Sequence, residues 1–279
     1  MKRIPDGAVD MILTDPPFGT TDNFWDKCLP MSEMWEQFNR VTKVNAAIVV
    51  FSQLPFAVDV INANRKMFRY EWVWQKPMPV GFLNARKMPM RCHENILVFY
   101  RKLPTYNPQW MYGKPYTKIA NKYWNCYGKA KWNGGVVTES ADGRRYPRDV
   151  LTFNNGNFGK RDHPTGKPVE LLEYLIKTYT NEGELVLDAC MGSGSTAVAA
   201  VNTGRHFVGF ETYDKYYDVA LRRIEESRNG GSKETVKEEN SEGVMGYDLF
   251  REMYGQQGAA SFPCQDQTQG FDSISLGQV

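Results

Sequence analysis

The sequence predicts an α/β fold built on an open sheet. Short apolar runs rich in β-branched residues, at 9–13, 46–51 and 185–188, are typical of buried strands in such a sheet. Amphipathic stretches such as 34–41 and 169–179 separate them and fit helices. A chain of 279 residues can hold one large domain of this kind together with an inserted module and a tail.

The other expected elements follow from the same patterns. In chain order they are a helix at 55–68, strands at 70–75 and 96–100, a helix of small residues at 197–201, a strand at 207–210 and a helix at 213–228. Periodicity fails from Arg101 to Asp162, where aromatic residues alternate with Lys and Arg. That range is predicted to be an irregular insertion, and its rings either stack on nucleic-acid bases or form the insertion's own core.

Charge is spread unevenly although the net charge is only +2. Residues 101–162 carry 12 Lys/Arg against 4 Asp/Glu, a net of +8, which favours a polyanionic partner. Residues 230–279 carry 3 against 8, a net of −5, in a Gly-, Ser- and Gln-rich composition that predicts a mostly disordered tail. With no long apolar run and no signal peptide, we expect a soluble cytoplasmic protein. The five cysteines show no paired spacing, so no metal site or disulfide is predicted.

The stretch Thr14-Asp15-Pro16-Pro17-Phe18-Gly19 is the first candidate site. It follows the strand at 9–13, and two prolines without N–H groups end that strand. A carboxylate and an aromatic ring are therefore held at the carboxyl end of a strand, where open α/β sheets bind ligands. An ordinary turn would explain the same residues.

The second candidate site is the strand at 185–188 with the glycine turn that follows, Asp188-Ala189-Cys190-Met191-Gly192-Ser193-Gly194-Ser195-Thr196. Glycines let a backbone approach a ligand closely, and the next helix offers free N–H groups. Glu211 ends the next strand, where an acid commonly holds ribose hydroxyls. A dinucleotide would suit this pattern too, but the Gly-x-Gly-x-x-Gly fingerprint is absent.

Together these motifs resemble the amino-methylating DNA methyltransferases, which modify adenine N6 or cytosine N4, in the motif order of their β group. The resemblance implies a Rossmann-like, S-adenosylmethionine-dependent methyltransferase fold with permuted motif order and an inserted target-recognition region. Asp15, Pro16, Pro17 and Phe18 would be catalytic, with the Asp15 carboxylate and Pro16 carbonyl accepting the amino hydrogens of an extruded base and Phe18 stacking on it. The residues expected to bind the cofactor are Thr165, Lys167, Asp188, Gly192, Ser193, Gly194, Ser195, Thr196 and Glu211.

The same resemblance divides the chain into four parts. Residues 1–100 form the catalytic half, 101–162 the target-recognition insertion, 163–228 the cofactor-binding half and 229–279 the tail. The expected substrate is double-stranded DNA. Family members with Asp at position 15 mostly methylate adenine, so N6 of adenine is the expected target and N4 of cytosine the alternative. The resemblance also allows a homodimer and a partner restriction nuclease.

Two departures from the family pattern support a different hypothesis, a non-catalytic DNA-binding remnant. A strand ending in Gly-Asp that usually precedes the catalytic motif is absent, and Ala189-Cys190 replaces Pro-Phe. The family also usually has Gln where this chain has Gly166. Methylation of protein glutamine or of RNA is a third hypothesis, but those relatives carry Asn-Pro-Pro-Tyr with the opposite motif order. His93 and Glu94 lack a partner at metal spacing and are interpreted as structural.

Overall fold

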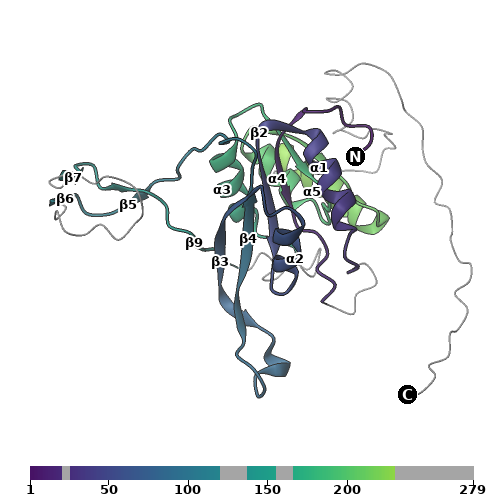
Figure 1. Cartoon of the computed structure of the whole chain (residues 1–279), viewed down its shortest axis with the longest axis horizontal. Helices are drawn as coiled ribbons and strands as arrows, with labels where there is room; N and C mark the ends of the chain where they lie inside the picture. The colour runs from purple at the N-terminus through teal and green to yellow at the C-terminus, as the bar shows by residue number, and fades with distance from the viewer. Residues whose placement is uncertain (21–25, 120–136, 155–165, 230–279) are drawn as a thin grey trace, which may run out of the picture. The chain divides into compact units, whose positions relative to one another are not determined.

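The computed structural model describes residues 1–20, 26–119, 137–154 and 166–229. Within these ranges a seven-stranded sheet has the order β11-β10-β1-β2-β4-β3-β9 (Figure 1). Its strands are β1 (Val9–Thr14), β2 (Thr42–Ser52), β3 (Phe68–Val80), β4 (Arg91–Phe99), β9 (Val150–Thr152), β10 (Leu185–Asp188) and β11 (His206–Gly209). β4 runs antiparallel to both of its neighbours, and the other described pairs are parallel.

Helices cover both faces of the sheet. They are α1 (Met31–Val41), α2 (Phe56–Ala63), α3 (Val169–Tyr179), α4 (Ser195–Asn202) and α5 (Asp214–Arg228). Alternate residues of one strand point to opposite faces, so in β1 Met11 and Leu13 pack with α3 and α4, whereas Ile12 packs with α1 and α2. α5 packs on α4 through a small cluster that includes Ala220 and Ile224. The predicted α/β class and its Rossmann-like layering are confirmed.

The site lies between two neighbouring strands, β1 and β10, whose following connections lead to opposite sides of the sheet. β1 sits between β10 and β2 in the sheet; α1 leads from β1 to β2, and α4 leads from β10 to β11 on the other side. The carboxyl ends of β1 and β10 are therefore next to each other, with no connection crossing between them. Such a switch point is where open α/β sheets form a ligand crevice. Asp15 follows β1 directly, and Asp188 is the last residue of β10.

Most predicted elements are found, with shifted ends. The helix expected at 55–68 ends at Ala63, since Asn64 leaves the helical backbone conformation. The strand expected at 70–75 runs from Phe68 to Val80 despite Pro77 and Pro79. Both prolines fall where the pairing with β4 is irregular, so no ladder hydrogen bond is lost. The helix expected at 169–179 has these bounds in α3, and Pro168 takes its N-cap position.

The range predicted as an insertion contains several short strands. β5 (Met111–Tyr112) pairs with β8 (Arg144–Arg145), and β6 (Tyr116–Ile119) pairs with β7 (Val137–Ser140). Some of its aromatic rings pack on its own cations: the Arg145 guanidinium lies 4.4 Å from the Tyr116 ring centroid. β9 belongs to the main sheet, where it pairs with β3, although it lies within this range. The part of the insertion between 120 and 136, and the predicted tail from 230, lie outside the described residues.

Candidate active site

A pocket of about 850 Å³ lies at the switch point. This volume is within the roughly 300–1,000 Å³ usual for ligand sites. The predicted residues that line it are Asp15, Pro16, Pro17, Phe18, Lys167, Asp188, Gly192, Ser193, Ser195, Thr196 and Glu211. The structure therefore brings the two candidate sites into one pocket. Gly194 is not among its lining residues, and Thr165 lies outside the described residues.

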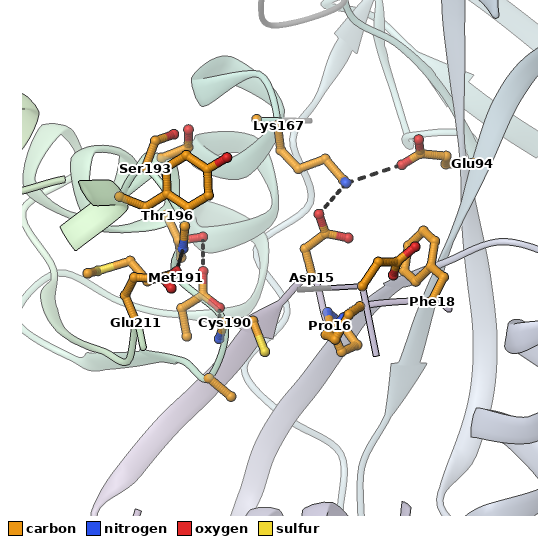
Figure 2. Close-up of a pocket in the computed structure, with 18 of the residues that line it drawn as sticks. Asp15, Pro16, Phe18, Glu94, Lys167, Cys190, Met191, Ser193, Thr196 and Glu211 are labelled. Atoms are coloured by element: carbon orange, nitrogen blue, oxygen red, sulfur yellow. Dashed lines mark hydrogen bonds and ion pairs between the residues drawn. The ribbon is translucent and has the colours of Figure 1, made fainter. Parts of the chain in front are cut away.

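Asp15 is held by a cation from the far half of the chain. The Lys167 ammonium is bonded to Asp15 Oδ2 and lies 3.5 Å from Glu94 Oε2 (Figure 2). The other Glu94 oxygen is bonded to the ammonium of Lys76. The result is a row of alternating charges in the order Asp15, Lys167, Glu94 and Lys76. Asp15 Oδ1 is buried and has no hydrogen-bond partner among the described residues, which leaves an acceptor available to a ligand.

The charges in this row control one another's protonation. Burial raises the pKa of Asp15, and Lys167 limits the rise. Burial would raise the pKa of Glu94 as well, but Lys167 and Lys76 outweigh it and hold that pKa below its usual value. Burial acts to lower the pKa of Lys167, yet Asp15 and Glu94 keep it above the usual value. Lys167 is therefore charged, and of the two carboxyl groups in this row only Asp15 has a pKa above its usual value.

The loop after Asp15 is fixed by its own hydrogen bonds. Asp26, a buried carboxylate, accepts bonds from the backbone N–H groups of Gly19 at 2.8 Å and Thr20 at 2.9 Å. Gly19 has a φ of +67°, a conformation that favours glycine. The Phe18 ring packs on Phe56 of α2, with centroids 5.1 Å apart. Phe56 thus holds the Phe18 ring in position at the pocket.

The glycine turn after β10 is organised around Asp188. This buried carboxylate accepts a bond from the Thr196 hydroxyl at 2.6 Å and another from the Cys190 N–H at 3.0 Å. Burial raises its pKa to about 6, against the lowering effect of those two bonds. The hydroxyl of Thr196, predicted to contact a cofactor, therefore bonds within the protein.

Two serines of the same turn also bond within the protein. The Arg223 guanidinium of α5 donates to Ser193 Oγ at 2.8 Å and to Ser195 Oγ at 3.2 Å. Gly194 has a φ of +76°, and a side-chain carbon there would lie 2.8 Å from the Ala220 Cβ. These predicted cofactor residues thus hold the turn against α5, and they shape the pocket wall through the backbone.

Glu211, which follows the neighbouring strand β11, binds the backbone of the glycine turn. Its Oε2 accepts a bond from the Gly192 N–H at 2.8 Å, and its Oε1 accepts bonds from Thr212 and Tyr213, each at 2.8 Å. A carboxylate oxygen can accept more than one hydrogen bond, so ribose hydroxyls can still bind it. The donor and acceptor set at this end of the pocket fits a nucleoside with hydroxyl groups.

Sequence reasoning missed two charged residues of the pocket, Lys76 and Glu94. Glu94 is opposite Trp74 in the β3–β4 register, and Lys76 is two positions further along β3. Residues i and i+2 of a strand share a face, so Trp74, Lys76 and Glu94 face α3 and Lys167 together. The signal in the sequence was a Glu two residues before the apolar run of β4. Without knowledge of β3, the strand that pairs there, that Glu is interpreted as the polar end of a strand.

Comparison with known proteins then identifies the chain. A family described as DNA methylase, of the N6/N4 type, matches residues 9–222. The chain belongs to this N6/N4 DNA methylase family. The predicted family is confirmed, and so is S-adenosylmethionine as the cofactor that goes with it. DNA is the substrate class of the family.

Individual relatives agree with this assignment. The DNA adenine methyltransferase YhdJ of Escherichia coli K12 is 26% identical over 256 residues, which cover 85% of this chain and 83% of the relative. The crystal structure of an M1.HpyAVI–SAM complex matches with a TM-score of 0.53 and 24% identity, over 80% of this chain and 90% of the other. The cytosine-N4-specific PvuII DNA methyltransferase matches with a TM-score of 0.56 and 16% identity, over 82% and 87%. The two structures establish the shared fold.

Two features are absent from the described residues. No helix there combines the length and apolar character that crossing a membrane requires. No group of three or more His, Cys, Asp or Glu in those ranges is arranged to hold a metal ion.

Proposed function

We propose that this methylase transfers the methyl group of S-adenosylmethionine to N6 of adenine in double-stranded DNA. The observation that carries the proposal is the buried, unpartnered Oδ1 of Asp15 at the pocket, next to a carboxylate oxygen already bonded to Lys167. An acceptor fixed in this way can take a hydrogen bond from an exocyclic amino group. The choice of adenine rests on Asp at position 15 and on the adenine-methylating relative YhdJ.

The residues around the glycine turn would hold the cofactor. Asp188 and Glu211 supply carboxylates at the carboxyl ends of β10 and β11, and Gly192, with a φ of +53°, keeps that backbone free of a side chain. When bound, S-adenosylmethionine supplies an electrophilic methyl group. The Lys167 ammonium has three N–H donors and two carboxylate partners, Asp15 and Glu94, so a third donor could bind a ligand carboxylate.

Asp15 has two tasks in this mechanism. Its Oδ1, with the Pro16 carbonyl, would accept the two amino hydrogens of the target base and favour a nitrogen whose lone pair points at the methyl group. Its raised pKa also suits it to receive the proton that the nitrogen loses on methylation. Phe18, backed by Phe56, would stack on the extruded base.

The test is transfer of labelled methyl from S-adenosylmethionine to unmethylated duplex DNA, followed by digestion to nucleosides. We expect label on N6-methyladenine, lost in Asp15→Ala and retained in the control Asp59→Ala, an exposed acid in the first turn of α2. Label on N4-methylcytosine would overturn the choice of base. No label and no cofactor binding by calorimetry would favour the non-catalytic remnant.

The remaining predictions about the setting of this enzyme are compatible with a DNA substrate. A cytoplasmic location, a homodimer and a partner restriction nuclease stay predictions. The assignment of 101–162 to target recognition also stays a prediction, supported by its excess of Lys and Arg.

A further inference from the structure

The β3–β4 hairpin extends beyond the rest of the sheet. β2 pairs with β4 only as far as Asn95, and β9 pairs with β3 only as far as Gln75. Among the described residues, the hairpin between Lys76 and Arg91 is therefore a two-stranded ribbon without a strand on either side (Figure 1). It leaves the sheet at the end where β1 and β2 reach their carboxyl termini, because Ser52 of β2 is opposite Asn95.

The tip of this ribbon exposes apolar side chains. The short helix η1 (Phe82–Asn84) presents Phe82 with 79% and Leu83 with 97% of its surface exposed. Met78, Met88 and Met90 are exposed nearby. Apolar surface gathered in this way on a projecting element marks a site of contact with another molecule.

The charge of the ribbon indicates what that molecule is. Beyond Lys76, which is already paired with Glu94, residues 77–93 carry three cations, Arg86, Lys87 and Arg91, and no Asp or Glu. A second copy of the chain docked through a two-fold axis would set these cations against each other. A polyanion would neutralise them, so nucleic acid fits the ribbon better than another copy does.

The ribbon is also continuous with the active-site pocket. Lys76, Val80 and Arg91, at its base, line the same pocket as Asp15. A duplex that delivers a base to Asp15 therefore lies beside the ribbon. The major groove of DNA is wide enough to admit a two-stranded ribbon, and apolar residues such as Phe, Leu and Met are those that other proteins insert between base pairs.

We propose that the β3–β4 ribbon is a DNA-binding element in its own right: Arg86, Lys87 and Arg91 contact phosphates, and Phe82 and Leu83 act as a wedge that supports extrusion of the target base. This inference rests on the proposed DNA methylation and adds a contact separate from the predicted insertion at 101–162. It assigns the cations to affinity and the apolar tip to extrusion, so the two parts are tested separately.

The cations are tested by binding of a fluorescently labelled random-sequence duplex as a function of salt. Each phosphate contact contributes about 0.9 to the slope of log K against log salt, so Arg86→Gln/Lys87→Gln is expected to flatten the slope by about 2. The control is Arg65→Gln/Lys66→Gln, the same exposed dipeptide just before β3, at the opposite end of that strand from the ribbon. Equal slopes for the two variants would overturn the phosphate contacts.

The wedge is tested by methylation of a duplex whose target base is paired or mispaired. Extrusion of a mispaired base costs less, so Phe82→Ser/Leu83→Ser is expected to slow methylation of the paired duplex about tenfold or more and to be rescued by the mispaired one. Val58→Ser, an exposed apolar residue on α2, is the control. Equal loss on both duplexes, or no loss, contradicts the wedge.

Two other outcomes separate this inference from competing explanations. Light scattering compares the oligomeric states of the wild type and of Phe82→Ser/Leu83→Ser. If the wild type is a dimer, the variant is a monomer and the DNA affinity is unchanged, then the tip is an interface between copies and the proposal is overturned. A wild-type protein that binds duplex but methylates nothing would contradict the proposed function, while the salt slopes would still decide the phosphate contacts.

Discussion

The Lys167 ammonium is bonded to the Asp15 carboxylate although 152 positions separate the two residues in the sequence. One belongs to the segment that enters α3, and the other follows β1. Only 9% of the Lys167 side chain is exposed, so this contact is made largely out of water. The position and charge of Asp15 therefore depend on a residue of the cofactor-binding half.

Replacement of Lys167 by Met is expected to destabilise the fold. It would leave the carboxylates of Asp15 and Glu94 without the cation between them, and loss of one member of a buried ion pair costs about 3–5 kcal/mol. The control Lys177→Met breaks an exposed pair with Glu173 on α3 and should cost about 1 kcal/mol or less. Urea unfolding at neutral pH measures both, and equal losses would contradict the prediction.

Replacement of Glu94 by Gln is expected to extend activity to lower pH. Burial is the main cause of the raised pKa of Asp15, and the nearby Glu94 charge adds to it. Without that charge the pKa of Asp15 falls, and the acid limb of kcat/KM, where Asp15 becomes protonated, moves to lower pH. Glu71→Gln, which removes an exposed acid of β3 bonded to Asn95, should leave the limb in place. A shift to higher pH in Glu94→Gln would refute this electrostatic account.

Replacement of Asp188 by Asn is expected to stabilise the protein at alkaline pH and not at acid pH. The pKa of Asp188 is about 6 in the folded state against 3.8 ordinarily, so ionisation above pH 6 opposes folding. Relative to wild type, the variant should gain up to about 3 kcal/mol at pH 8, and the gain should fade as the pH drops through 6 toward 4. Thermal or urea unfolding across this range gives the difference. A gain independent of pH would point to packing instead.

Replacement of Gly194 by Ala should damage the glycine turn more than the same change at Gly183. Both glycines have a φ near +77°, a conformation that costs other residues about 1–2 kcal/mol. At Gly194 the new methyl group would also meet Ala220 at 2.8 Å, whereas at Gly183 nothing lies within 4 Å. Only Gly194→Ala should therefore weaken binding of S-adenosylmethionine, measured by calorimetry. Similar affinities in the two variants would show that Ala220 does not fix the turn.

The sequence was sufficient to predict the strands and helices that carry the two motifs. β1 and β10 are found close to their expected bounds because each is a short continuous apolar run that ends at a turn, and α3 is found because its apolar residues recur at helical spacing. The pairing of β1 with β10 was not visible in those patterns and comes from the structure. For this reason the residues themselves indicated two candidate sites, and the fold joins them into one pocket.

Side-chain partners were the part that the sequence could not supply. Glu94 was interpreted as structural, yet it lies in the pocket between Lys167 and Lys76. Ser193, Ser195 and Thr196 were predicted to bind the cofactor, and the structure adds that their hydroxyls bond to Arg223 and Asp188. In each case the partner comes from a distant element, and no local pattern records which distant side chain faces a given residue.

The parallel pairing of β1 with β10 has a consequence for how the protein is made. The strand that precedes Asp15 leaves the ribosome well before its neighbour β10 and the cation Lys167 are synthesised. Until then one edge of β1 has no partner strand, and such edges attract wrong partners. During synthesis that edge of β1 is therefore open to wrong pairing, and the pocket is complete only when the cofactor-binding half has been translated.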